Sequence, residues 1–167
     1  LWPCLKSHEP VSLLVIMLGT NDSKERFGMN AFAISLGMRR LVQKAQTTDC
    51  WGPGGKPNIL IVAPPVIGEG VRKAYEEALV PAVIGEGVLA SSVADEMGTM
   101  GPNCVEKSRK LPAHYKRVAE EVGCHFLDAN QVGAEFNQID FMHLTRAGHA
   151  ALAKALAEMV PALLNNG

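Results

Sequence analysis

An aspartate and a histidine three residues apart, Asp140 and His143, are the first candidates for chemistry in this sequence. At this spacing in a loop, the carboxylate can fold back onto the imidazole, fix its tautomer and stabilise the imidazolium that forms when the other ring nitrogen takes a proton. An ordinary acid–histidine pair at a helix start explains the two residues equally well. A second histidine, His149, follows in the first turns of the predicted C-terminal helix, and we expect it to be a partly buried packing residue rather than a ligand.

The second candidate is the turn Gly19-Thr20-Asn21-Asp22, which directly follows the most apolar segment of the chain. Glycine permits a sharp turn, and the turn can place the amide of Asn21 over the end of the preceding strand. A fixed amide donor that faces a developing oxyanion contributes about 3 to 4 kcal/mol to transition-state stabilisation in acyl transfer. The alternative is an ordinary turn in which Asp22 or Ser23 caps the next helix.

Three short apolar segments have the composition of buried strands. Residues Leu13–Leu18 form a continuous run of mostly branched side chains closed by Gly19, as expected for a parallel strand covered on both faces. Residues Ile59–Ala63 repeat the pattern, and Pro64-Pro65 ends it because proline cannot extend a central ladder. Residues Cys124–Leu127 predict a third, shorter strand.

Apolar residues at near-helical spacing predict three helices. The first begins near Ala31 and ends at Thr47-Thr48, and the second runs over Lys110–Val122 with Gly123 as its C-terminal stop. The third begins at a Thr145 cap and runs to near the C-terminus.

The segment from Val66 to Asn103 shows poor periodicity and contains the hexapeptide Val-Ile-Gly-Glu-Gly-Val twice, at residues 66–71 and 83–88. Glycines on both sides of each glutamate indicate a mobile connection, and long irregular connections often serve as lids or oligomer contacts. We expect a local duplication within such a connection, to which the sequence assigns no function.

The alternation of strands and helices predicts an α/β protein with a parallel sheet covered by helices on both faces, in one domain over residues 1–167. In open parallel sheets, functional groups gather in the loops at the carboxyl ends of the strands. Both candidate sites are therefore expected at this edge of the sheet.

Composition excludes several classes of partner. The chain has 16 Lys and Arg against 17 Asp and Glu, so no basic field favours nucleic acid or anionic lipid. The apolar runs are far shorter than the roughly 20 residues of a membrane span, and we expect a soluble protein. The cysteines show no metal-type spacing with the histidines, so no metal site is predicted. The four cysteines fit reduced thiols or two disulfide bridges, and we expect reduced thiols, which favours the cytoplasm; a chain that begins with leucine leaves secretion open.

Two blocks of the sequence resemble a known family. Residues 15–22 are similar to the third conserved block of the SGNH, or GDSL-type, hydrolases, and residues 140–149 are similar to their fifth block. The match spans nearly the whole chain, and residues 1–41 also resemble the arylesterase/acyltransferase subgroup.

The resemblance implies a flavodoxin-like three-layer α/β/α fold with a parallel sheet. It further implies that Asn21 is an oxyanion donor in a loop supported by its neighbours in the turn, that His143 is the general base and that Asp140 orients it. Neither a metal nor an organic cofactor is implied.

The chain departs from the family in one respect. The first block, Gly-Asp-Ser-Leu, supplies the nucleophilic serine, and neither it nor the second block is present. No serine in this chain follows Gly-x or Gly-Asp, so the nucleophile is expected outside it, in a missing N-terminal segment or a second chain. Strands 1 and 2 of the family's sheet order 2-1-3-4-5 are then absent, which exposes the edge of the 13–18 strand to aggregation or to pairing with another chain.

We therefore expect a carboxylic ester hydrolase, an arylesterase or acetylesterase that acts on small acyl esters through an acyl-enzyme, with this chain alone inactive. The subgroup resemblance adds a homo-oligomer and acyl transfer to alcohols. The alternative is a non-catalytic binding or scaffold protein, or an inactive fragment, of the same fold. A nucleotide-binding domain is disfavoured because neither GxGxxG nor GxxxxGK[ST] follows a strand.

Overall fold

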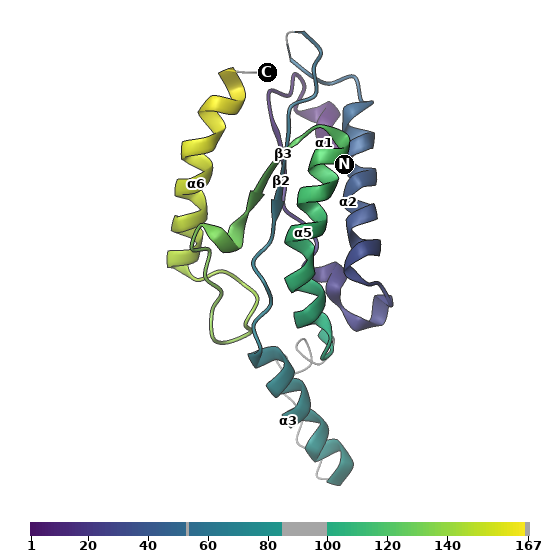
Figure 1. Cartoon of the computed structure of the whole chain (residues 1–167), viewed down its shortest axis with the longest axis vertical. Helices are drawn as coiled ribbons and strands as arrows, with labels where there is room; N and C mark the ends of the chain where they lie inside the picture. The colour runs from purple at the N-terminus through teal and green to yellow at the C-terminus, as the bar shows by residue number, and fades with distance from the viewer. Residues whose placement is uncertain (53, 85–99, 166–167) are drawn as a thin grey trace.

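A three-stranded parallel sheet forms the centre of the molecule (Figure 1). The computed structural model describes residues 1–52, 54–84 and 100–165. The strands are β1 (Leu14–Ile16), β2 (Ile59–Ala63) and β3 (His125–Asp128), in the spatial order β1-β2-β3. Leu14 pairs with Ile59, and Leu60 pairs with His125. The three predicted strands are confirmed, although β1 is shorter than its apolar run and β3 lies one residue later. The prediction that the first strand is covered on both faces is wrong, because Val15 of β1 is exposed.

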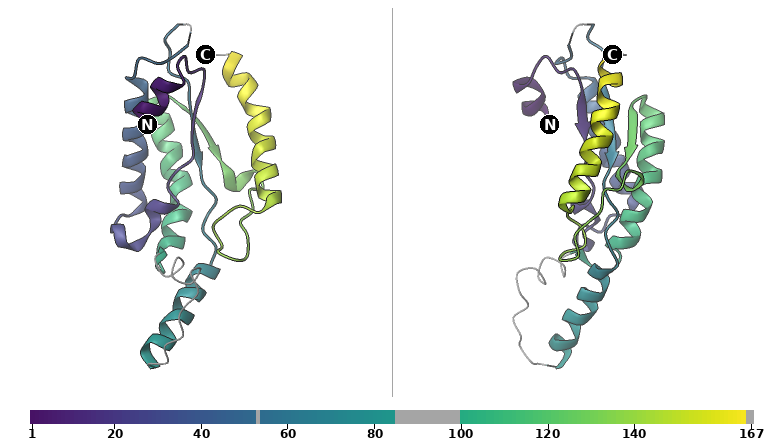
Figure 2. Two further views of the ribbon diagram at one scale, coloured as in Figure 1. Left: turned by 180° about the vertical axis from the view of Figure 1, so that it is seen from behind. Right: turned by 90° about the vertical axis from the view of Figure 1, so that its left-hand side faces the viewer.

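Helices cover both faces of the sheet (Figure 2). Helices α2 (Ala31–Gln46) and α5 (Cys104–Val122) pack on one face, and α6 (Arg146–Asn165) packs on the other. The C-terminal stop of α5 is confirmed, because Gly123 has a left-handed backbone with φ 70°. The predicted cap of α6 is also confirmed, since the Gly148 N–H donates to Thr145 Oγ1 at 2.8 Å.

Helix α5 begins six residues before the predicted Lys110. Its first turns bury Cys104, Val105 and Ser108, a helical spacing in which the serine interrupts the apolar pattern. Pro112 lies inside the helix, and because proline is most common in the first turn of a helix, it favours a predicted start later than Cys104.

The prediction of an irregular connection over residues 66–103 is wrong for its first part. Helix α3 (Gly70–Ile84) follows β2 and extends away from the sheet (Figure 1). The first hexapeptide copy is packed rather than loose, because Ile67 and Val71 are fully buried. The second copy lies largely outside the described residues. The short helix α1 (Trp2–Ser7) was not predicted either, and its Leu5 packs into the core.

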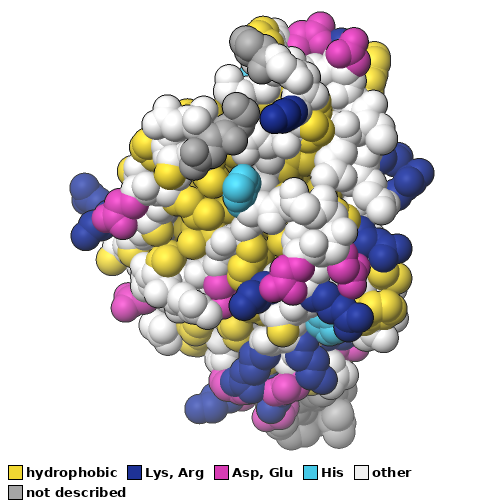
Figure 3. Space-filling view, turned by 45° about the horizontal axis from the view of Figure 1, so that its top comes forward, with side chains coloured by type: hydrophobic (Ala, Val, Ile, Leu, Met, Phe, Trp, Pro, Cys, Tyr) yellow, Lys and Arg dark blue, Asp and Glu magenta, His cyan; other side chains and the backbone are white. Residues whose placement is uncertain are grey.

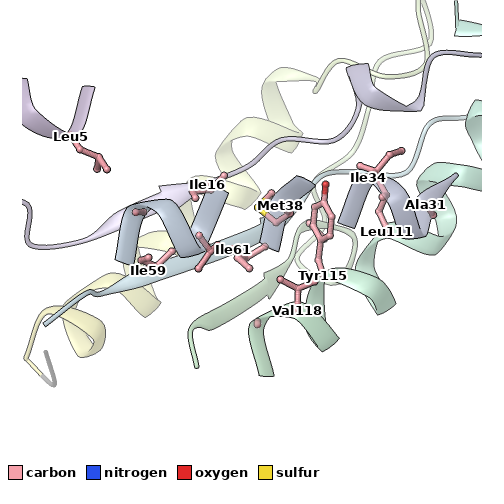
Figure 4. Packing of buried hydrophobic residues seen from close by; sticks show 14 of the residues in the cluster. Leu5, Ile16, Ala31, Ile34, Met38, Ile59, Ile61, Leu111, Tyr115 and Val118 are labelled. Carbon is pink, nitrogen blue, oxygen red and sulfur yellow. The ribbon is translucent and has the colours of Figure 1, made fainter. Parts of the chain in front are cut away.

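The side chains of β2 alternate between two core layers. Ile59 and Ile61 face α2 and α5, where they pack around Met38 and Tyr115 (Figure 4). Leu60 and Val62 face α6 and pack against its apolar stripe, which includes Leu152 and Leu163. All residues of β2 are buried, which explains why its sequence is uniformly apolar rather than alternating.

Strand β1 lies at one edge of the described sheet, and it and the two residues that follow it present apolar side chains to solvent. Val15 is 41% exposed, Met17 41% and Leu18 54%. The expected exposed apolar edge is therefore present, and its pairing with another chain stays a prediction.

Elsewhere on the surface, acidic and basic side chains lie close together, as toward the lower edge of the face in Figure 3. No helix among the described residues has both the length and the apolar character needed to cross a bilayer.

Candidate active site

The two candidate loops meet at one pocket at the carboxyl end of the sheet. The pocket has a volume of about 350 Å³, and both Asn21 and His143 line it. Its described lining combines apolar side chains with polar ones that can orient a ligand, as small-molecule sites do. It consists of Met17, Leu18, Thr20, Asn21, Lys24, Pro64, Pro65, Met100, Met142, His143, Leu144 and His149. The structure thus brings together residues that are more than 120 positions apart in the sequence.

The Asp140–His143 pair has the geometry that its spacing predicts. His143 Nδ1 lies 2.9 Å from Asp140 Oδ2. The aspartate side chain is 25% exposed, whereas the histidine side chain is 73% exposed. An ionised Asp140 accepts a hydrogen bond from Nδ1–H, which leaves Nε2 as the unprotonated nitrogen in the neutral ring. The pair is therefore arranged for His143 to accept a proton on Nε2.

Asp140 is held in its ionised form by its own loop. Its partial burial acts to raise its pKa, but hydrogen bonds outweigh that effect and lower the pKa to about 2. The backbone N–H groups of His143 and Met142 donate to Oδ1 at 2.9 and 3.0 Å, and the His143 ring bonds to Oδ2. The charge that can stabilise an imidazolium is consequently present at neutral pH.

Asn137 organises the same loop, although sequence reasoning did not identify it. Its Oδ1 accepts hydrogen bonds from the N–H groups of Ile139 and Asp140 at 2.8 and 3.0 Å. Its Nδ2 donates to the His143 carbonyl at 3.0 Å. An asparagine three residues before the aspartate is typical of a side-chain-capped turn, and this signal was available in the sequence.

Hydrogen bonds to the backbone carbonyls just before Asn21 hold the turn after β1 and so position this residue. Asn21 begins the short 3-10 helix η1 (Asn21–Ser23), and Gly19 has φ 124°, a conformation that favours glycine. The Tyr115 hydroxyl donates to the Leu18 carbonyl at 3.1 Å, and Ser23 Oγ donates to the Gly19 carbonyl at 3.1 Å. Burial raises the pKa of Tyr115, so this hydroxyl remains a donor.

The alternative in which this turn caps the next helix is wrong. Ser23 is fully buried and bonds backwards to Gly19. The cap of α2 is Asn30 instead, whose Oδ1 accepts a hydrogen bond from the Ala33 N–H at 2.8 Å. The 3-10 turns η1 and η2 (Glu25–Phe27) separate Ser23 from that helix.

The expectation for His149 is also wrong. It is exposed rather than partly buried, and it lines the pocket together with His143. Lys24 lines the same pocket and was not singled out from the sequence. Neither residue belongs to a recognisable local sequence pattern. Which side chains reach the pocket depends on how η1 and α6 come together in the folded chain.

Gly19 and Asp22 do not line the pocket, so within the predicted supporting turn only Thr20 reaches it beside Asn21. Among the described residues, neither serine nor cysteine lines the pocket, and Ser35 and Ser108 are buried elsewhere. The part of the chain that the structure describes contains no group of three His, Cys, Asp or Glu side chains arranged to hold a metal ion.

A family model covers most of this chain. The model of the GDSL-like lipase/acylhydrolase family matches residues 2–151. The chain belongs to this family. No protein of curated function matches it in sequence.

Solved structures of esterases have the same fold as this GDSL-like chain. A carbohydrate acetylesterase family member from Sinorhizobium meliloti superposes with a TM-score of 0.76 at 28% identity, over 98% of this chain and 66% of that one. A carbohydrate acetylesterase from the same species gives 0.74 at 30% identity, over 96% and 65%. The aryl esterase of M. smegmatis gives 0.73 at 29% identity, over 96% and 65%.

These matches confirm the resemblance to SGNH hydrolases and the predicted α/β/α fold with a parallel sheet. The chain spans about two thirds of the length of these three proteins, since it covers 66%, 65% and 65% of them.

Proposed function

We propose that this GDSL-like chain supplies the acid, the base and an oxyanion donor of a carboxylic ester hydrolase that acts on small acyl esters. The observation that supports this proposal is that Asn21 and the Asp140–His143 pair meet at one pocket. An amide donor and a proton acceptor beside one apolar cavity are the groups that acyl transfer requires. The solved relatives are a carbohydrate acetylesterase family member, a carbohydrate acetylesterase and an aryl esterase, and they suggest acetyl or aryl esters as the substrates.

In the proposed mechanism, a serine outside this chain is the nucleophile. Its Oγ attacks the acyl carbon while Nε2 of His143 takes the hydroxyl proton, and the carbonyl π electrons move onto the oxygen. Asn21 donates to that oxyanion, and Asp140 stabilises the imidazolium through Nδ1–H. The alcohol leaves with the proton from Nε2, and water then releases the acid by the same steps.

The apolar lining suits a small acyl group. Met17, Leu18 and Met142 line the pocket beside the polar groups, and an acyl group bound against them would exclude water and strengthen the hydrogen bonds that form in the transition state. We further propose that the protein is a homo-oligomer whose subunit interfaces narrow the site. Exclusion of water from a narrowed site would favour acyl transfer to an alcohol over hydrolysis.

Steady-state turnover of p-nitrophenyl acetate by the native protein that contains this chain tests the proposal. We expect His143→Ala to lower kcat by about 10³-fold or more and Asn21→Ala to lower it by about 10²- to 10³-fold with a small change in KM. His125→Ala replaces an exposed histidine on β3 that does not line the pocket and serves as the control. Turnover that is unaffected by both pocket variants would contradict the proposal.

A further inference from the structure

The first hexapeptide copy, residues 66–71, is bound to its surroundings through consecutive backbone groups. The Val66 N–H donates to Asn130 Oδ1 at 2.8 Å, and the Ile67 N–H donates to Ser108 Oγ at 3.0 Å. The next amide, that of Gly68, donates to the Phe141 carbonyl at 2.8 Å. The segment is therefore fixed to three separate parts of the fold, and the third of these is the loop between Asp140 and His143.

Both glycines of this copy leave space that an aromatic ring occupies. A Cβ atom on Gly70 would lie 2.3 to 2.4 Å from three ring carbons of Phe141. A Cβ atom on Gly68 would lie 2.5 Å from the Phe136 ring and 3.1 Å from Phe141 Cβ. Neither glycine has a positive φ, so these positions need glycine for the close approach of the rings rather than for backbone freedom.

Phe141 adopts an unfavourable backbone conformation between the two site residues. It is the one non-glycine residue with positive φ among the described residues, at 60°. Such a conformation is unfavourable for a residue with a side chain and persists only where the surrounding structure fixes it. Phe141 and Met142 pack against a buried cluster that includes Ile67 and Val71 from the hexapeptide.

We propose that residues 66–71 form a seat for Phe141, and that Gly68 and Gly70 are positioning residues that set the Asp140–His143 pair through this ring. The backbone of Phe141 joins Asp140 to the Met142 and His143 amides that bind its carboxylate. A displaced ring therefore rotates those amides away from Oδ1. The functional meaning of this positioning rests on the proposed acid–base role of the pair.

The glutamate between the two glycines strengthens the seat. Glu69 Oε1 lies 2.6 Å from Arg109 Nη2, which ties the hexapeptide to α5. Arg109 also pairs with Glu106 at 2.7 Å on the same helix. The first copy thus contacts its surroundings through an exposed ion pair of its glutamate, through its two glycines and through its two buried apolar residues.

Site-specific NMR on the native protein that contains this chain tests the proposal without reference to ester turnover. The readouts are the carboxyl ¹³C titration of Asp140 and the Nδ1–H resonance of His143. In Gly70→Ala, we expect the pKa of Asp140 to rise from about 2 to about 3 or higher, and the Nδ1–H resonance to be lost through solvent exchange. The control is Gly37→Ala, where an added Cβ meets nothing within 4 Å on α2, and both readouts should be unchanged.

A double-mutant comparison shows whether Gly70 acts through the ring. Phe141→Ala removes the ring and should raise the Asp140 pKa by itself. If Gly70 acts through Phe141, the double variant Gly70→Ala/Phe141→Ala should titrate as Phe141→Ala alone does. Additive effects, or an Asp140 titration that neither single variant moves, would overturn the proposal.

If Gly70→Ala does not fold, the Phe141→Ala titration decides the question: a raised Asp140 pKa supports the seat, and an unchanged one refutes it. Because these readouts report only the geometry of the loop, a protein without esterase activity can still pass this test. The two proposals therefore fail separately.

Discussion

Replacing Asp140 with Asn should reduce stability in a pH-dependent way. The pKa of Asp140 lies at about 2, compared with its ordinary value of 3.8. A tenfold change in acidity corresponds to about 1.4 kcal/mol, so the ionised carboxylate stabilises the fold by at most about 2.5 kcal/mol. Because its side chain is 25% exposed, solvent screening reduces this contribution, and we expect about 1 to 2 kcal/mol at pH 7.

The direction of the pH dependence follows from the lowered pKa. A carboxylate that is more acidic in the folded state contributes its full stability above about pH 4 and loses it as the pH falls toward 2. The difference in the free energy of unfolding between the parent and Asp140→Asn should therefore be constant from pH 7 to about pH 5 and shrink between about pH 4 and 2.

Urea unfolding followed by circular dichroism measures this difference at a series of pH values. The matched control is Asp49→Asn, at an exposed position outside the pocket, which should stay within about 0.5 kcal/mol of the parent throughout. A difference for Asp140→Asn that does not change between pH 5 and 3 would show that ionisation of this carboxylate does not stabilise the loop.

Three further predictions concern the surroundings of the site. Tyr115→Phe removes the hydroxyl that donates to the Leu18 carbonyl and should cost about 1 kcal/mol in urea unfolding; equal stability would mean that this hydrogen bond contributes nothing. Asn130→Ala removes two hydrogen bonds to the segment that follows β2 and should cost about 1 to 2 kcal/mol in the same assay, whereas a neutral result would show that those bonds are replaced by water. Cys4 is exposed, whereas burial raises the pKa of Cys104 to about 11. At pH 8 an aromatic disulfide reagent should therefore modify Cys4 at least about 10-fold faster, and equal rates would contradict the burial of Cys104.

The strands and the three long helices could be predicted because their burial is encoded locally. Ile59–Ala63 is apolar at every position since both faces of β2 are covered, and the alternation of elements then specifies a parallel sheet. Helix α3 and the start of α5 could not be predicted in this way. Glycine and proline usually interrupt helices, and the periodicity of Cys104 to Ser108 is weakened by a buried serine.

The site residues likewise divide into those whose contacts are local in sequence and those whose contacts depend on distant parts of the chain. Asp140 and His143 could be predicted because their contact is formed within four residues of sequence. His149 was misjudged because its exposure depends on how α6 meets the turn after β1. The glycines of residues 66–71 resembled a loose loop because the ring that they contact lies about 70 positions further along the chain.

Fluorophosphonate labelling of the native protein, read by intact mass, tests whether His143 and Asp140 serve a serine hydrolase. We expect one label per active site on a species that contains a serine from outside this chain, and a strong reduction of that labelling in His143→Ala. If the only species has the mass of this chain, 17.9 kDa, and neither becomes labelled nor turns over p-nitrophenyl acetate, the proposed role of His143 and Asp140 in ester hydrolysis is contradicted.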